Sequence, residues 1–156
     1  MKLEVGDRAP EFSLPDQNGN ILSLKDFFGT RFLLYFYPKD NTTGCTKEAC
    51  MLRDDFLDFK KLSVNIVGVS ADSVISHKKF AEEYTLPFTL LADEKKEVLN
   101  AYGVWGEKSM YGKKYMGTLR TSFLIGPTGI IEKIYEKVKP AEHSGEVLED
   151  IKKLGQ

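Results

Sequence analysis

Residues 31–37 read RFLLYFY, a continuous apolar run that is rich in aromatic side chains. A run of this length and composition predicts a strand buried on both faces, as in the centre of an α/β sheet. Pro38 ends the run, and a loop of turn-forming residues, KDNTTG, follows it. A helical pattern then covers residues 45–60, so a buried strand, a loop and a helix are predicted in direct succession.

The rest of the chain predicts strands that alternate with helices. We expect strands at residues 21–24, 64–70 and 88–91, and helices at residues 74–84, 95–102 and 144–154. Residues 1–20 look irregular, and residues 105–118, rich in glycine and charge, predict a loop.

A hairpin is expected near the end of the chain. Its strands would be residues 121–125 and 130–138, joined by the turn Gly126-Pro127-Thr128-Gly129. Alternating elements followed by a hairpin favour an α/β fold, a mixed β-sheet flanked by helices on both faces. No repeat, low-complexity tract or linker interrupts the pattern, so we expect a single domain over residues 1–156.

The composition excludes several classes of partner. The 156 residues include 22 basic and 23 acidic side chains, for a formal net charge of −1. This balance offers no basic footprint for nucleic acid and no polybasic patch for a membrane surface. The longest apolar run is too short to span a bilayer, and the N-terminus lacks the apolar region of a secretory signal. The expected location is the cytoplasm.

The chain has two cysteines, Cys45 and Cys50. A small secreted disulfide scaffold carries four or more as a rule, and a zinc site needs about four ligands. Neither His77 nor His143 lies near the cysteines in sequence, so no metal site is expected. Three interpretations stay open: a redox pair, a catalytic cysteine with a bystander, or two inert core residues.

Cys45 falls in the first turn of the predicted helix. Unpaired backbone N–H groups and the helix dipole favour a thiolate at such a position, which therefore suits a nucleophile. Thr42 can place a hydroxyl beside the sulfur, and Pro38 can limit the access of water to the loop. The plainer alternatives are that Cys45 is a small residue near a helix cap and that Thr42 is a turn residue.

Cys50 follows Cys45 by five positions. On an ideal helix, the two Cα atoms would lie roughly 8.7 Å apart. A disulfide needs less than about 7 Å. Either the two cysteines never bond, with Cys50 a core residue, or the first turn unwinds when they do.

Four segments resemble the peroxiredoxins, and in particular their Q subclass, the bacterioferritin comigratory proteins. Pro38, Thr42 and Cys45 have the P-x-x-x-T-x-x-C spacing of the family, and residues 44–50 (GCTKEAC) resemble the Q subclass. Residues 6–12 (GDRAPEF) resemble the opening of the family, and residues 120–125 (RTSFLI) its arginine-bearing strand. With the hairpin and the last helix, the similarity covers nearly the whole chain. It departs at Thr43, where many Q-type sequences have proline, which bears on the rigidity of the loop.

The resemblance implies a thioredoxin-like fold and a thiol-dependent peroxidase that reduces hydrogen peroxide and organic hydroperoxides. Cys45 would be the peroxidatic residue, oxidised to sulfenic acid, and Cys50 the resolving residue that closes a disulfide with it. Thr42 and Arg120 would bind and polarise the peroxide, beside Pro38, with Glu48 as a supporting residue. From the sequence alone, Arg120 is an ordinary surface charge and Glu48 an ordinary acid of a first helical turn.

The implied reductant is a dithiol protein such as thioredoxin, the implied state is a monomer, and no cofactor is implied. Two alternatives remain. The first is a thiol-disulfide oxidoreductase, against which the absence of a C-x-x-C pair counts. The second is a non-enzymatic redox-sensing domain whose disulfide alters its contacts with a partner.

Overall fold

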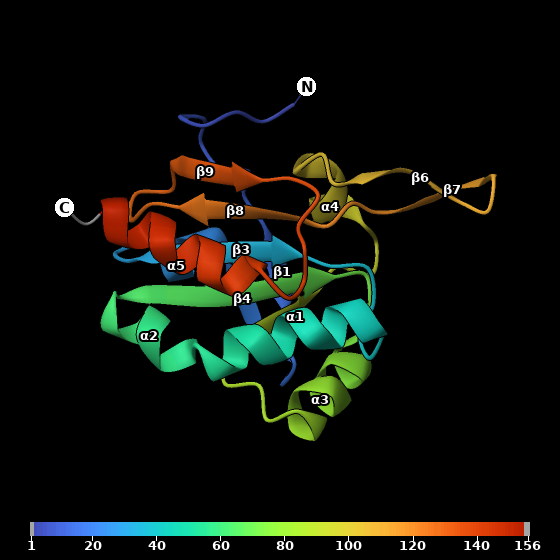
Figure 1. Ribbon diagram of the computed structural model, residues 1–156, viewed down its shortest axis with the longest axis horizontal. Helices are drawn as coiled ribbons and strands as arrows, with labels where there is room; N and C mark the ends of the chain where they lie inside the picture. Colours follow the sequence, from blue (N-terminus) through green and yellow to red (C-terminus); the bar gives the residue numbers. More distant parts are fainter. Residues whose placement is uncertain (1, 155–156) are drawn as a thin grey trace.

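A five-stranded sheet forms the centre of the protein, seen in a computed structural model that describes residues 2–154 (Figure 1). Its strand order is β5-β4-β3-β8-β9. β3 pairs in parallel with β4, and β4 with β5, whereas β8 is antiparallel to both β3 and β9. The sheet is therefore mixed, as expected. The strands are β3 (Arg31–Phe36), β4 (Val64–Ser70), β5 (Thr89–Ala92), β8 (Thr121–Ile125) and β9 (Ile131–Tyr135).

β3 is buried on both faces, as its apolar run predicts. Alternate side chains point to opposite faces of a strand, so the run supplies two cores at once. Phe32, Leu34 and Phe36 belong to one core, and Leu33 and Tyr35 to the other. This double burial places β3 in the centre of the sheet, and the end of β3 leads into the loop before α1.

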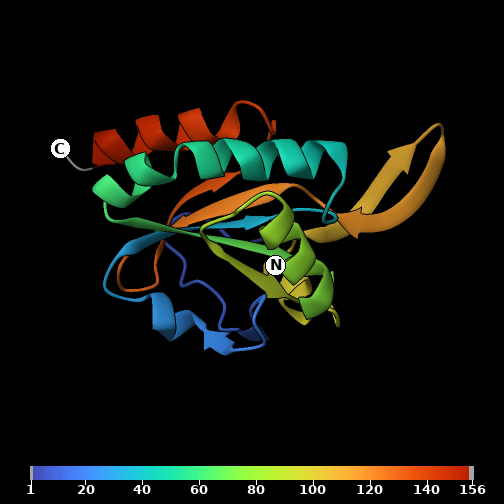
Figure 2. The ribbon, with the colours of Figure 1, turned by 90° about the horizontal axis from the view of Figure 1, so that it is seen from below.

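The two faces of the sheet carry different layers. One core contains side chains of α1 (Thr43–Asp54), α2 (Phe56–Lys61), α3 (Val74–Glu83) and α5 (His143–Leu154). The other contains side chains of the 3-10 helix η1 (Leu24–Phe27) and of α4 (Glu97–Ala101), with β1 (Ser13–Pro15) and β2 (Ile21–Ser23) packed against it. Figure 2 shows α1 and α5 above the sheet and the β1–β2 ribbon below it. Helices thus cover both faces, as expected.

Several predicted boundaries need correction. The helix predicted over residues 45–60 is interrupted at Asp55, which ends α1 and precedes α2. The strand predicted over residues 130–138 ends at Tyr135, two residues before Lys137 with its positive φ of 51°. The irregular N-terminal region contains the short strand β1. None of the helices in residues 2–154 has the length and apolar character that a membrane crossing requires.

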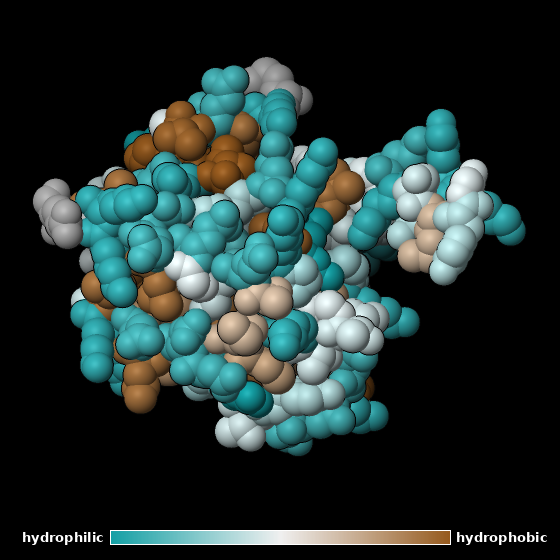
Figure 3. Space-filling model, in the orientation of Figure 1, coloured by the Kyte–Doolittle hydropathy of each residue, from teal (hydrophilic) through white to brown (hydrophobic). Residues whose placement is uncertain are grey.

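The prediction of a loop over residues 105–118 is wrong, because this segment forms a β-hairpin. β6 (Trp105–Met110) pairs antiparallel with β7 (Lys113–Thr118). Tyr111 and Gly112 turn the chain with φ of 53° and 78°, and positive φ at both central residues is typical of a two-residue type I′ turn. The hairpin projects from the body of the protein (Figure 3), and its base leads directly into Arg120 and β8.

Candidate active site

Cys45 lies at the start of α1, where the chain returns from the end of β3. Its side chain is buried, with 1% of its surface exposed. The first hydrogen bond of the helix runs from the Thr46 amide to the Thr42 carbonyl at 2.8 Å. The amides of residues 43–45 therefore lack a helical acceptor and give the start of α1 a partial positive charge. The start of α1 therefore provides the free amides and the partial positive charge that favour a thiolate at Cys45.

Arg120 connects two acidic or nucleophilic groups of α1. Its Nη2 donates to Cys45 Sγ at 3.3 Å, and its Nη1 donates to Glu48 Oε1 at 2.7 Å. The backbone of Arg120, between β7 and β8, is held by the Val138 amide, which donates to the Arg120 carbonyl at 3.2 Å. The structure therefore brings Cys45, Glu48 and Arg120 into one cluster, although 72 or more residues separate Arg120 from the other two.

Glu48 is the most unusual titratable group of this cluster. It is 1% exposed, and its Oε2 is buried without a hydrogen-bond partner among the described residues. Burial raises the pKa of Glu48 to about 7, and the charge and hydrogen bond of Arg120 only partly offset that effect. The Tyr35 hydroxyl is also buried without a partner, and burial, with the charges of Glu48 and Cys45, raises its pKa. A carboxyl group that titrates near neutral pH thus lies two hydrogen bonds from the Cys45 sulfur.

Thr42 and Pro38 border the loop that leads to Cys45. The Thr42 side chain is exposed, and its hydroxyl donates to the Lys39 carbonyl at 2.9 Å. Since this bond uses the hydroxyl proton, Thr42 Oγ1 meets a ligand as an acceptor. Pro38 is half-buried. Thr43, which stands where many Q-type sequences have proline, is the first residue of α1 and is exposed.

Cys50 lies further along α1 and is partly exposed, whereas Cys45 is buried; both are free thiols. The intact helix thus contains both cysteines, so ideal geometry separates their Cα atoms by roughly 8.7 Å. Cys50 borders an open, mainly apolar surface hollow of about 520 Å³. The other residues that line this hollow are Thr43, Gly44, Thr46, Lys47, Pro140 and Ala141.

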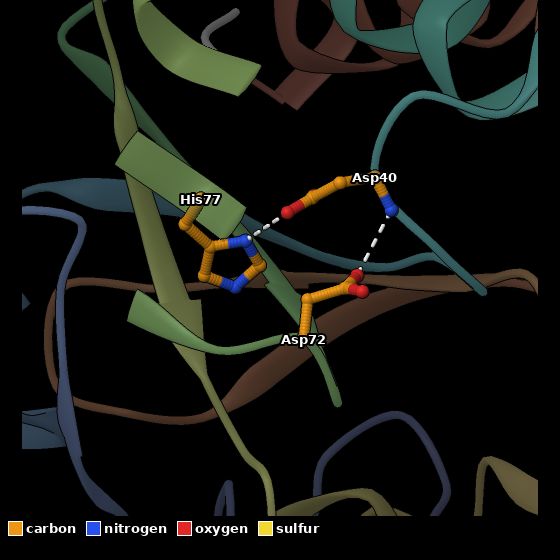
Figure 4. A group of neighbouring side chains, drawn as sticks. All are labelled: Asp40, Asp72 and His77. Carbon is orange, nitrogen blue, oxygen red and sulfur yellow. Dashed lines mark hydrogen bonds and ion pairs between the residues drawn. The ribbon is translucent and has the colours of Figure 1, made fainter. Parts of the chain in front are cut away.

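A buried polar network, which the sequence analysis did not find, fixes the loop before α1 (Figure 4). Asp40 Oδ2 lies 2.7 Å from His77 Nδ1, and the Asp40 carboxylate also accepts from the hydroxyls of Tyr37 and Ser76. The Asp40 amide donates to Asp72 Oδ2 at 2.9 Å. Because Asp40 is bonded to Asp72, between β4 and α3, and to Ser76 and His77 of α3, the loop that leads to α1 is held in place at Asp40.

Both ring nitrogens of His77 are held by hydrogen bonds. His77 Nε2 lies 2.9 Å from the Leu91 carbonyl, which can only accept, so Nε2 carries a proton. The Asp40 carboxyl group thus has three short contacts, with the hydroxyls of Tyr37 and Ser76 and with His77 Nδ1. Asp40, Asp72 and His77 lie within metal-binding distance of one another, but these hydrogen bonds occupy the atoms that a metal would need.

The AhpC/TSA family profile matches residues 5–134. Among curated proteins, the putative peroxiredoxin bcp of Coxiella burnetii is 49% identical over 148 residues, which are 95% of this chain and 98% of the relative. Peroxiredoxin Bcp of Escherichia coli K12 is 49% identical over 150 residues, covering 96% of each chain. Peroxiredoxin Bcp of Bacillus subtilis is 42% identical over 156 residues, covering 100% and 99%.

Solved structures agree with these relatives. Peroxiredoxin Q of Xanthomonas campestris superimposes with a TM-score of 0.88 at 36% identity, covering 93% of this chain and 92% of that one. A cysteine-to-serine mutant of PrxQ from Xylella fastidiosa gives a TM-score of 0.94 at 32% identity, covering 100% and 99%. These likenesses confirm the thioredoxin-like fold. The chain therefore belongs to the AhpC/TSA family and, within it, to the peroxiredoxins of the Bcp or Q type, which are thiol-dependent peroxidases.

Proposed function

We propose that Cys45 is the nucleophile of this peroxidase, that Cys50 resolves its oxidised form, and that Arg120, Thr42 and Glu48 complete the site. One observation carries the assignment: Cys45 Sγ lies at a helix start and 3.3 Å from the Arg120 guanidinium. A thiolate is the reactive form of cysteine, and both features stabilise it.

In the first step, the Cys45 thiolate attacks the terminal oxygen of the hydroperoxide. The O–O bond breaks, the sulfur is oxidised to sulfenic acid, and the leaving alkoxide or hydroxide takes up a proton. Arg120 and the amides of residues 43–45 are the donors that face the developing negative charge. Thr42 Oγ1 accepts a hydrogen bond from the O–H of the bound hydroperoxide, and Pro38 helps to exclude water.

In the second step, the Cys50 thiol displaces hydroxide from the sulfenic sulfur, so an S–S bond forms and water is released. A dithiol donor, for which we propose thioredoxin, then reduces this disulfide by exchange and is itself oxidised. Cys50 borders the apolar hollow at the surface, whereas Cys45 is buried, so the reductant approaches from the side of Cys50.

The substrates that we propose include organic hydroperoxides as well as hydrogen peroxide. The bacterioferritin comigratory protein of Xanthomonas campestris, 35% identical to this chain with a TM-score of 0.88, is described as reducing alkyl peroxides. We also propose that the chain acts as a single domain in the cytoplasm, as its pattern and composition predict, and as a monomer, as the resemblance of its motifs to the Q subclass implies.

Two variants test this function. Cys45→Ser should abolish peroxide consumption, because a serine hydroxyl is not ionised near neutral pH. Cys50→Ser should consume about one equivalent of peroxide and then stall as sulfenic acid with thioredoxin as the donor. Peroxide loss is followed by a peroxide electrode, thioredoxin oxidation by coupled NADPH loss, and the stalled species by mass spectrometry. Turnover of Cys45→Ser within a few-fold of the wild type would contradict the assignment of the nucleophile. Undiminished thioredoxin-linked turnover of Cys50→Ser would contradict that of the resolving residue.

A further inference from the structure

A second cation, Lys108, is held at the base of the β6–β7 hairpin, which leads directly into Arg120 of the cluster formed by Cys45, Glu48 and Arg120. Lys108 is on β6, and its Nζ donates to the Thr118 carbonyl at 3.0 Å. Thr118 is the buried last residue of β7, two positions before Arg120. The hydrogen bond therefore fixes the Lys108 ammonium at the base of the hairpin, where the chain enters the active site.

The path of the Lys108 side chain is set by a glycine of the opposite strand. A Cβ atom at Gly117 would lie 3.0 Å from Lys108 Cδ and 3.8 Å from its Cγ. The aliphatic stem thus crosses the hairpin over Gly117, the glycine of β7, and the Lys108 ammonium reaches the Thr118 carbonyl. Such a course buries the stem and leaves the charged end to act at a fixed place.

The charge of Lys108 is not neutralised by a neighbour. No carboxylate within residues 2–154 forms a salt bridge with it, whereas Lys114 of the same hairpin lies 3.6 Å from Glu107. The pKa of Lys108 is lowered by burial and by the charge of Arg120, while Cys45 opposes that change. Lys108 therefore shares an electrostatic environment with the two residues that meet the peroxide.

When Glu48 is ionised, a Cys45 thiolate and the Glu48 carboxylate together carry two negative charges against the single positive charge of Arg120. Arg120 is hydrogen-bonded to both Cys45 and Glu48. When the thiolate attacks, negative charge moves from the sulfur to the leaving oxygen while Glu48 keeps its share of the guanidinium. A free ammonium at the base of the hairpin can compensate that charge without giving up a salt bridge of its own.

We propose that Lys108 is a second cationic residue of the peroxide site, and that it lowers the barrier of the peroxide step by stabilising the negative charge that Cys45 transfers to the leaving oxygen. This proposal rests on the assignment of Cys45 as the nucleophile. It gives the projecting hairpin a part in the chemistry.

Three variants of the full chain test the proposal. Lys108→Gln should lower the second-order rate constant for hydrogen peroxide by about three- to tenfold, the size expected for one partly screened charge. Lys108→Arg should restore most of the rate, because it keeps the charge. Lys113→Gln, on the exposed part of the same hairpin, is the matched control and should react like the wild type. The loss in Lys108→Gln should shrink as ionic strength rises.

A charge-selective alkylation separates this role from a structural one. Iodoacetate is an anion and iodoacetamide is neutral, so the ratio of their rates with Cys45, measured in a Cys50→Ser background, reports the local charge. We expect that ratio to fall by about threefold in Lys108→Gln and to hold in Lys108→Arg and Lys113→Gln. An unchanged ratio and an unchanged peroxide rate in Lys108→Gln would overturn the proposal, provided that Cys45→Ser is inactive. An active Cys45→Ser would instead overturn the assignment of the nucleophile.

Discussion

Arg120 is the single residue that holds both Cys45 and Glu48. Its planar guanidinium donates to the two residues from different nitrogens, at 3.3 and 2.7 Å. A lysine ammonium is a compact, strongly hydrated charge and cannot reproduce this fork. We expect Arg120→Lys to lower the rate constant for hydrogen peroxide by about tenfold or more, since two charge-assisted hydrogen bonds are disturbed.

Arg31→Lys is a matched control for that measurement. Arg31 also pairs with a carboxylate, Glu132 at 2.6 Å, but at the beginning of β3 and away from Cys45. Stopped-flow measurements give the rate constant of the peroxide step for Arg120→Lys, Arg31→Lys and the wild type. Equal rate constants for Arg120→Lys and the wild type would mean that the contact to Cys45 has no part in the reaction.

The raised pKa of Glu48 makes the free energy of unfolding depend on pH. Its pKa is about 7 in the folded protein, above its ordinary value of 4.5, because burial disfavours the charged form. The folded state therefore holds the Glu48 proton more tightly than the unfolded state does. The free energy of unfolding should fall as pH rises from about 4.5 to about 7, by an amount on the order of 3 kcal/mol from this group.

Glu48→Gln should remove this dependence, because glutamine resembles the protonated acid. We expect the variant to gain stability relative to the parent between pH 5 and pH 8, measured by urea unfolding in a Cys45→Ser background that excludes titration of the thiol. Glu149→Gln, an exposed change on α5, should show no such gain. If the free energies of unfolding of Glu48→Gln and its parent differed by the same amount at pH 5 and at pH 8, Glu48 could not be the group whose titration lowers stability.

At the scale of residues, the sequence predicts Cys45 from physics, because an apolar strand, a turn and a helix can be recognised locally. Arg120 and Glu48 could be predicted only from the resemblance, since nothing in their local sequence separates them from surface charges. Asp40, His77 and Lys108 were missed for a physical reason. Each obtains its role from a contact across the fold, such as the pairing of Asp40 with His77 over 37 positions.

Among the elements, α1 has to serve two incompatible half-reactions. The first needs a formed turn at Cys45, with its free amides, and the second needs Cys45 and Cys50 within disulfide range. The intact helix spans both cysteines, which ideal geometry places roughly 8.7 Å apart. We therefore expect the first turn to unwind on oxidation. Its threonines and glycine are weak helix formers, and the end of a helix opens at low cost.

Hydrogen exchange on the reduced and oxidised protein tests the unwinding. Exchange should rise between about residues 43 and 53 on oxidation, and the far-UV helical signal should fall slightly. Asp40 is anchored by His77 and Asp72. The increase in exchange should therefore begin after Asp40, and the amides of β4 and α3 should keep their protection. A structure of the disulfide form with an unaltered α1 would show this expectation to be wrong.

The β6–β7 hairpin shows why one element escaped sequence analysis. Its turn is Tyr111-Gly112 and not the Asn-Gly or Asp-Gly pair that marks most hairpins of this type. Its strands are mostly exposed, and apart from the partly buried Lys108 only their ends next to the body are covered. Alternation between apolar and polar residues indicates a strand when one face is buried. A ribbon exposed on both faces lacks that constraint, and glycine and charge made it resemble a loop.

For the molecule as a whole, the order of strands along the chain predicts the class of fold but not the packing of its layers. Gly68 illustrates the difference, because its sequence context is only that of a buried strand. In the sheet, Gly68 of β4 lies opposite Tyr35 of β3 and Leu90 of β5. A Cβ at this position would lie 2.8 Å from Tyr35 Cζ and 2.9 Å from Leu90 Cδ2. The absence of a side chain therefore makes the space that the Tyr35 ring fills.

Two glycine-to-alanine changes should accordingly have opposite effects on global stability. Gly68→Ala should lower the free energy of unfolding by about 1–3 kcal/mol, because a packed ring and a buried leucine must move to admit a methyl group. Gly145→Ala, on the exposed side of α5 with no atom within 4 Å of the added Cβ, should raise it by about 0.5–1 kcal/mol through helix propensity. Urea unfolding of the reduced proteins measures both. Because Tyr35 belongs to the same core as Cys45, Gly68→Ala should also slow the peroxide step, whereas Gly145→Ala should leave it unchanged. If the two variants had the same free energy of unfolding, the close packing around Gly68 would not contribute to the stability of the core that contains Tyr35 and Cys45.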